Sequence, residues 1–251
     1  VKELIVIAQD ITRYGMDWDG KPHLADLLEE LCKLDFHWIR LHYLYPEWID
    51  DRLIDVIARE DKILKYLDIP LQHCNDKILK KMNRRGDKKY LCALLDKLRE
   101  RIPGLVLRTS IIAGLPGEGE EEFDELCDFL REQKLLRAGV FPYSPEEGTR
   151  AAKMERVDSD EAARRAERIV DIQSEIIDAW NDERQGDVME VLCEGFDGQS
   201  MLFVGRSYAE SPDIDGRIYF SAPRDVAAGE FVPVRITSAM DGELTGELAE
   251  E

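Results

Sequence analysis

The chain has 251 residues, a hydrophobic fraction of 44% and a formal net charge of −19. This negative charge argues against a nucleic-acid-binding surface over most of the chain. The sequence contains neither a long apolar run nor an N-terminal signal pattern, so we expect a cytoplasmic protein without a membrane span. The length is enough for one large domain and one small domain.

Five cysteines are spread along the sequence, at positions 32, 74, 92, 127 and 193. Their number is odd, and no two of them have C-x-x-C or C-x-x-x-C spacing. We therefore expect neither a disulfide framework nor a local zinc or iron–sulfur motif, and we assign no metal-ligating residue.

Residues 1–151 alternate strand-like apolar runs with segments of helical periodicity. This alternation predicts an α/β fold, a partial open βα barrel with five parallel strands in sequence order. The expected strands are Leu4–Gln9, Trp38–Tyr45, Tyr66–Gln72, Val106–Gly114 and Gly139–Tyr143. The expected helices are Leu24–Leu34, Ile49–Arg59, Asp76–Asn83, Lys88–Arg101 and Glu120–Lys134.

Residues 152–185 are predicted to connect this barrel to a second domain, mainly through one long helix over Ser159–Glu183. After Gly186 the pattern changes to about five short β-rich runs separated by Gly, Pro and Asp, which predicts a small all-β barrel of OB-like size at 186–251. This module contains 14 acidic residues, four arginines and no lysine.

Polar residues recur on one face of three predicted strands. Side chains alternate across a strand, and a fully covered parallel strand should be almost entirely apolar, so this pattern favours a hydrated, ligand-binding barrel interior. The alternative is that these groups face solvent or form structural ion pairs, for example between Arg40 and Asp68. The polar set is Arg40, His42, Asp68, Gln72, Arg108 and Ser110.

Two predicted strands end in unusual loops. Gly114, Pro116 and Gly117 bring the backbone close to whatever lies above the strand end, and a βα turn of this kind is a frequent ligand site in α/β enzymes. The aromatic-rich loop Phe141–Thr149 is either ordinary turn chemistry or an apolar platform for a flat ring such as adenine. Asn75 is expected to cap the helix that follows it.

Taken together, these strand ends resemble the methylthiotransferases of the radical S-adenosylmethionine superfamily. The resemblance covers nearly the whole chain, including a C-terminal module similar to a TRAM domain, at Val204–Arg206 and Ser211–Gly216. The motifs that carry it in the barrel are Ala8–Gly15, Trp38–Tyr43, Pro70–His73, Asp76–Met82, Leu107–Ile112, Gly117–Glu118 and Tyr143–Thr149.

The resemblance implies that the full-length enzyme uses S-adenosylmethionine and two 4Fe-4S clusters, one of which generates a 5′-deoxyadenosyl radical from S-adenosylmethionine. By analogy with the superfamily's barrel, the residues expected to cradle S-adenosylmethionine are Gln9, Gln72, Arg108, Ser110, Gly114, Phe141, Tyr143 and Ser144. No catalytic residue is assigned.

Within the family, the RimO-like branch adds a methylthio group to the β-carbon of an aspartate in small-subunit ribosomal protein twelve, and the sister MiaB-like branch modifies an adenosine of tRNA. The C-terminal module has a formal charge of −10, which suits a basic ribosomal protein better than phosphate. A tRNA-modifying relative and a non-catalytic remnant of the barrel remain the alternatives.

The sequence departs from the family pattern in three ways. It has no C-x-x-x-C-x-x-C motif, and it begins where the second barrel strand should begin. Cys74-Asn75 and Gly119 also replace residues that are more usual in the family. We therefore expect the distal barrel and TRAM part of a RimO-like enzyme, inactive without its cluster ligands.

Overall fold

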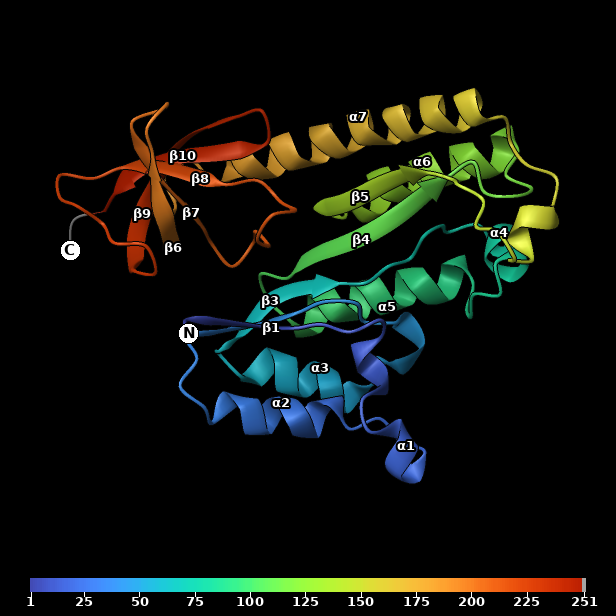
Figure 1. Cartoon of the computed structure of the whole chain (residues 1–251), viewed down its shortest axis with the longest axis horizontal. Coiled ribbons are helices and arrows are strands. Elements are labelled where there is room, and N and C mark those ends of the chain that lie inside the picture. The colour runs from blue at the N-terminus through green and yellow to red at the C-terminus, as the bar shows by residue number, and fades with distance from the viewer. Residues whose placement is uncertain (250–251) are drawn as a thin grey trace. The chain divides into compact units, whose positions relative to one another are not determined.

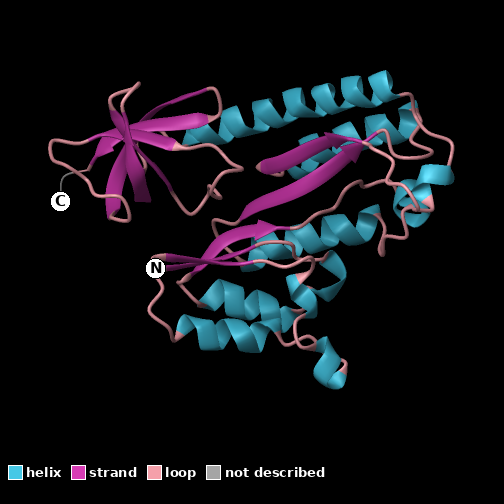
Figure 2. Ribbon diagram, in the orientation of Figure 1, coloured by secondary structure: helices cyan, strands magenta, loops and turns pink. Residues whose placement is uncertain are grey.

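The computed structural model describes residues 1–249, and the chain divides into two compact units, Val1–Gln173 and Ser174–Glu251 (Figures 1 and 2). The long helix α7 (Ser159–Glu183) includes the boundary between them. None of the helices in residues 1–249 is long and apolar enough to cross a lipid bilayer.

The first unit is built on a five-stranded parallel sheet with the order β1-β2-β3-β4-β5. This is the predicted fold class, an α/β partial barrel whose strands follow sequence order. The strands are β1 (Glu3–Val6), β2 (Trp38–Leu41), β3 (Ile63–Asp68), β4 (Val106–Ala113) and β5 (Arg137–Pro142).

Helices connect consecutive strands, as parallel pairing requires. Figure 1 shows α2 and α3 lying alongside one another, and α3 also contacts β3 and α5. The α-helices are α1 (Met16–Asp19), α2 (Leu24–Cys32), α3 (Asp51–Arg59), α4 (Asp76–Lys81), α5 (Lys88–Arg101) and α6 (Glu120–Gln133). Short 3-10 turns occupy η1 (Ile11–Arg13), η2 (Pro46–Trp48) and η3 (Ala151–Lys153).

The core of this unit lies between the helices and the apolar face of the sheet. Ile39, Leu41, Leu67 and Ile111 share that face and are fully buried. The side chain of Asn75 caps the start of α4, as expected from the sequence. The Asn75 carboxamide oxygen accepts hydrogen bonds from the backbone N–H groups of Lys77 and Ile78, which stabilises the first turn of α4.

The second unit contains a closed five-stranded barrel with the order β10-β8-β7-β6-β9, which agrees with the predicted small β-barrel. Its buried core includes Val191, Ile218, Phe220, Val234 and Leu244. The strands are β6 (Val188–Asp197), β7 (Leu202–Arg206), β8 (Ile218–Ser221), β9 (Phe231–Met240) and β10 (Glu243–Leu248).

The largest differences from the predicted elements are the early ends of two strands: β2, predicted to run to Tyr45, ends at Leu41, and β3, predicted to run to Gln72, ends at Asp68. Pro70 has no N–H for the ladder, and Gln72 has a left-handed backbone with φ of 69°. Gln72 still forms an isolated parallel bridge with Ile111 of β4. The chain therefore leaves the sheet early but stays beside it.

Candidate functional site

The polar face of the sheet carries a chain of buried charged side chains. Arg40 on β2 is fully buried, and its Nε donates to the Glu3 carboxylate on β1 at 2.7 Å. Its guanidinium also lies 4.7 Å from the ring centroid of Tyr66 on β3, a cation–π distance. Arg40 is therefore held by β1 and β3 and does not face solvent.

Asp68 joins three strands of this face. The Arg108 guanidinium on β4 donates to one Asp68 oxygen at 2.9 Å, and the Nδ1 of His42 lies 3.3 Å from the other. Burial disfavours the Asp68 charge, but the hydrogen bonds from His42 and Arg108 outweigh burial and hold the pKa of this carboxyl below its ordinary value.

The sequence left open whether the polar residues of this face point to solvent or form structural ion pairs, and these contacts answer the question for Arg40 and Asp68. Arg40 and Asp68 are both fully buried, so neither faces solvent. The suggested ion pair between Arg40 and Asp68 is wrong. Arg40 pairs with Glu3, and Asp68 pairs with Arg108 and His42. The polar face is thus an organised ion-pair network.

Glu118 organises the turn after β4. Its Oε1 accepts the Gly114 N–H at 2.9 Å and a hydrogen bond from Nη1 of Arg165 at 2.9 Å. The Nε2 of His73 lies 3.3 Å from the second carboxylate oxygen. Burial opposes the Glu118 charge, yet His73, Arg165 and the Gly114 N–H together lower its pKa.

Gly114 itself has φ of +81° and faces α7. A Cβ built on it would lie 2.4 Å from the Cβ of Ala162, closer than real Cβ contacts allow. The absence of a side chain at this position is therefore required by packing against α7, in addition to the backbone conformation.

The predicted cradle residues lie on or after four of the five strands. Gln9 follows β1 and is exposed. Gln72 and Ser110 are adjacent, because the Gln72 N–H donates to the Ser110 carbonyl oxygen at 2.8 Å. The Gln72 carboxamide oxygen accepts from Nε of Arg84 at 3.2 Å.

The remaining members of the predicted set lie at the end of β5. Ile112 of β4 pairs with Phe141, a residue that is 54% exposed. The backbone N–H of Tyr143 donates to the Ala113 carbonyl oxygen at 2.7 Å, and Ser144 is exposed. The Tyr143 hydroxyl is buried and has no hydrogen-bond partner among residues 1–249.

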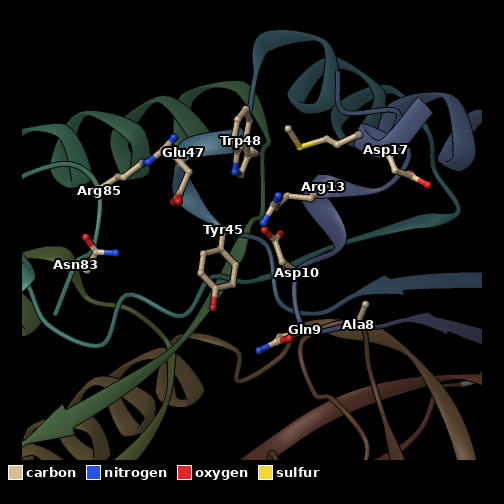
Figure 3. Close-up of a pocket in the computed structure, with 11 residues that line it drawn as sticks. Ala8, Gln9, Asp10, Arg13, Asp17, Tyr45, Glu47, Trp48, Asn83 and Arg85 are labelled. Carbon is tan, nitrogen blue, oxygen red and sulfur yellow. The ribbon is translucent and has the colours of Figure 1, made fainter. Parts of the chain in front are cut away.

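A pocket of about 750 Å³ opens at the segments that follow β1 and β2 (Figure 3). Of the eight predicted cradle residues, Gln9 lines this pocket. The other lining residues are Ala8, Asp10, Arg13, Met16, Asp17, Tyr45, Glu47, Trp48, Asn83 and Arg85.

Most of these pocket residues were missed by the sequence analysis. Arg13, Asp17 and Trp48 lie in the short helical elements η1, α1 and η2, which have too few residues to produce a periodic pattern. The available signal was the concentration of charged and aromatic residues directly after two predicted strands, where α/β enzymes place ligand-binding groups.

The structure groups no candidate metal ligands around the five cysteines in residues 1–249. Within residues 1–249, no three or more His, Cys, Asp or Glu side chains are grouped so that they could hold a metal ion. All five cysteines are free, and burial raises the pKa of the Cys74 thiol far above its ordinary value, which disfavours the thiolate that binds iron.

Comparison with protein families identifies the larger unit. The model described as the radical SAM superfamily matches residues 3–130. The chain belongs to this superfamily. A second model, described as the TRAM domain, matches residues 186–249 and includes all five strands of the closed barrel. The recognised resemblance to radical S-adenosylmethionine proteins with a TRAM domain is therefore confirmed.

Curated relatives extend this similarity along the whole chain. Ribosomal protein uS12 methylthiotransferase RimO of Symbiobacterium thermophilum is 47% identical over 254 residues, covering 100% of this chain and 52% of the relative. The protein of the same name from Pelotomaculum thermopropionicum is 48% identical over 251 residues, covering 98% of this chain and 56% of the relative. The chain thus spans about half the length of these relatives.

Among solved structures, coproporphyrinogen III oxidase HemN from Escherichia coli, a radical SAM enzyme, is similar to this chain with a TM-score of 0.51. The match has 20% sequence identity and covers 62% of this chain and 39% of that chain. At this identity the likeness supports the fold and carries no argument about substrate.

Proposed function

We propose that this chain is the distal barrel and TRAM part of a methylthiotransferase that modifies an aspartate of ribosomal protein uS12. The observation that carries the proposal is the identity of 43–48% to RimO proteins along 98–100% of the chain. The similarity includes both the radical SAM unit and the TRAM domain, so it is not limited to a widespread barrel.

The cradle for S-adenosylmethionine is proposed at the ends of β3, β4 and β5, together with Gln9 after β1. Phe141 offers a half-exposed ring on which adenine can stack, and the Tyr143 hydroxyl retains hydrogen-bonding capacity. Gly139 has no side chain to cover the Phe141 ring. A Cβ at this position would lie 3.2 Å from that ring. The further members of the cradle are Gln72, Arg108, Ser110, Gly114 and Ser144.

The acidic TRAM unit is proposed to dock a basic protein. Arg206 and Arg224 are neutralised by Glu194 and Glu230, at 2.6 and 2.7 Å. Exposed carboxylates predominate on the remaining surface, at Asp187, Glu190, Asp213, Asp225, Asp241 and Glu247. Such a surface repels phosphate and attracts a lysine- and arginine-rich protein.

The coding sequence upstream of Val1 gives the most direct test of enzymatic function. A C-x-x-x-C-x-x-C motif in an open reading frame continuous with this chain would supply the cluster ligands that residues 1–249 do not group together. An upstream stop codon, in a gene that produces only this chain, would favour a non-catalytic binding protein instead.

A further inference from the structure

The pocket after β1 and β2 is lined by five charged side chains: Asp10, Arg13, Asp17, Glu47 and Arg85 (Figure 3). Resting on the proposed function, we propose that this pocket selects the substrate peptide, with Arg13 and Arg85 binding the carboxylate of the aspartate to be modified. The three acidic residues bind basic side chains that flank this aspartate.

The two arginines are available for a ligand. Neither Arg13 nor Arg85 forms an ion pair with a carboxylate in the described part of the chain, and both are exposed. The Arg85 guanidinium lies 6.0 Å from the ring centroid of Trp48, which orients it while leaving its N–H groups free to donate. A planar guanidinium matches a carboxylate with two parallel hydrogen bonds.

The adjacent Arg84 provides an internal contrast. Its Nε donates to the Gln72 carboxamide oxygen at 3.2 Å, and its Nη1 donates to the Pro70 carbonyl oxygen at 3.4 Å. Its guanidinium lies 5.0 Å from the ring centroid of Tyr45. Arg84 therefore fixes the chain after β3, whereas Arg85 keeps its donors for a ligand.

The acidic residues define what surrounds the bound carboxylate. Asp10 accepts the Thr12 N–H at 3.0 Å, which fixes its position in the turn before η1. Asp17 and Glu47 form no ion pair in residues 1–249 and lie on opposite sides of the opening in Figure 3. Three carboxylates around two arginines suit a peptide in which an acidic residue lies between basic ones.

The same charges argue against a polynucleotide. Three carboxylates at the mouth of the pocket would repel the successive phosphates of an RNA strand. Tyr45, Trp48 and Met16 supply apolar surface for the aliphatic parts of lysine and arginine side chains. A short basic peptide with one central aspartate offers a group of opposite charge to both arginines and to the three carboxylates of the pocket.

The test uses the full chain and a fluorescent synthetic peptide with a central aspartate between lysines and arginines, followed by anisotropy. Each of Arg13→Gln and Arg85→Gln should weaken binding about tenfold, because each removes a charge-assisted hydrogen-bond pair. Arg131→Gln, an exposed arginine on α6, is the matched control and should bind as the unchanged chain does.

A second peptide with asparagine in place of the aspartate completes a double-mutant cycle. It should bind about tenfold more weakly to the unchanged chain, and Arg13→Gln should then cause little further loss. Asp17→Asn and Glu47→Gln should weaken the lysine-containing peptide and leave an alanine-substituted peptide unaffected. Circular dichroism of each variant verifies that it remains folded.

Equal binding of both peptides by the unchanged chain and by the two arginine variants would overturn the pocket assignment, and so would absence of peptide binding. A separate measurement tests the proposed function. If purified uS12 does not bind the unchanged chain, the proposed function is wrong. If uS12 binds and the arginine variants bind it equally well, the proposed function stands and the pocket assignment is wrong.

Discussion

Glu118 is the residue that connects the turn after β4 with the start of α7. It is 3% exposed and contacts Gly114, His73 and Arg165, which is 47 residues away. Charged pairs at this depth are costly to break, since removal of one member leaves the other buried without compensation. Glu118 belongs to a family motif that is visible in the sequence, but its partners lie far away along the chain and could not be predicted from it.

Replacing Glu118 tests this network. We expect Glu118→Gln to lower the free energy of unfolding at neutral pH by about 3 kcal/mol, since it leaves the Arg165 guanidinium without its innermost partner. Urea denaturation of the full chain measures the change. Glu121→Gln, which changes an exposed residue in the first turn of α6, should alter stability by less than about 0.5 kcal/mol.

The pH dependence of this variant follows from the lowered pKa of Glu118. A carboxyl whose folded-state pKa lies below its ordinary value of 4.5 contributes stability above pH 4.5 and loses it as the pH falls through the folded-state pKa. The unchanged chain should therefore lose more stability than Glu118→Gln between about pH 6 and about pH 3. Parallel curves for both proteins would contradict this account.

Phe141 tests the proposed cofactor cradle at the residue scale. Phe141→Ala should weaken binding of S-adenosylmethionine about fivefold or more, because stacking of a base on an aromatic ring contributes about 1–3 kcal/mol. Equilibrium dialysis with the full chain provides the measurement. Phe196→Ala, which removes a ring of similar exposure from the TRAM unit, is the matched control. An equal effect of both substitutions would argue against a cradle at β5.

At the scale of elements, most of the fold could be predicted because the strands and the longer helices carry strong periodic patterns. The long helix α7 has the predicted bounds, and the β4 prediction differs from the structure by one residue. The early end of β3 and the short helices η1, α1 and η2 could not be predicted in this way. They depend on Pro70, a left-handed Gln72 and tertiary contacts.

Site residues on strands could be predicted from the sequence, whereas site residues in turns and short helices could not. Residues on strands, such as Arg108 and Ser110, could be assigned to one face from alternation alone. Arg13, Trp48 and Arg85 come from turns whose path is set by tertiary contacts, so their convergence around one pocket became evident only in three dimensions.

The contact between the β4–α6 turn and α7 leads to a prediction about element packing. Gly114→Ala should lower the free energy of unfolding by about 3 kcal/mol, from left-handed strain and from the clash with Ala162. Gly148→Ala has a similar φ of +83° and open space around it, so it should lose only about 1 kcal/mol. Thermal unfolding of both variants separates strain from packing, and equal losses would refute the packing contribution.

At the scale of the whole molecule, the cysteines make a prediction about iron–sulfur content. The five thiols have no cluster spacing and are not grouped with other metal-binding side chains in residues 1–249. Anaerobic reconstitution of this chain with iron and sulfide should therefore give no stoichiometric 4Fe-4S absorbance. A stable cluster that is lost on substitution of Cys74, Cys92 or Cys127 would contradict this prediction.

The proposed function implies that this chain binds ribosomal protein uS12 in preference to RNA. The most direct measurement is binding of the full chain to purified uS12 and, separately, to tRNA at low and high salt. We predict salt-sensitive binding to uS12, because the −10 charge of residues 186–251 attracts a basic protein, together with weak or absent binding to tRNA. Preferential binding to tRNA would contradict the claim and assign the chain to the tRNA-modifying branch.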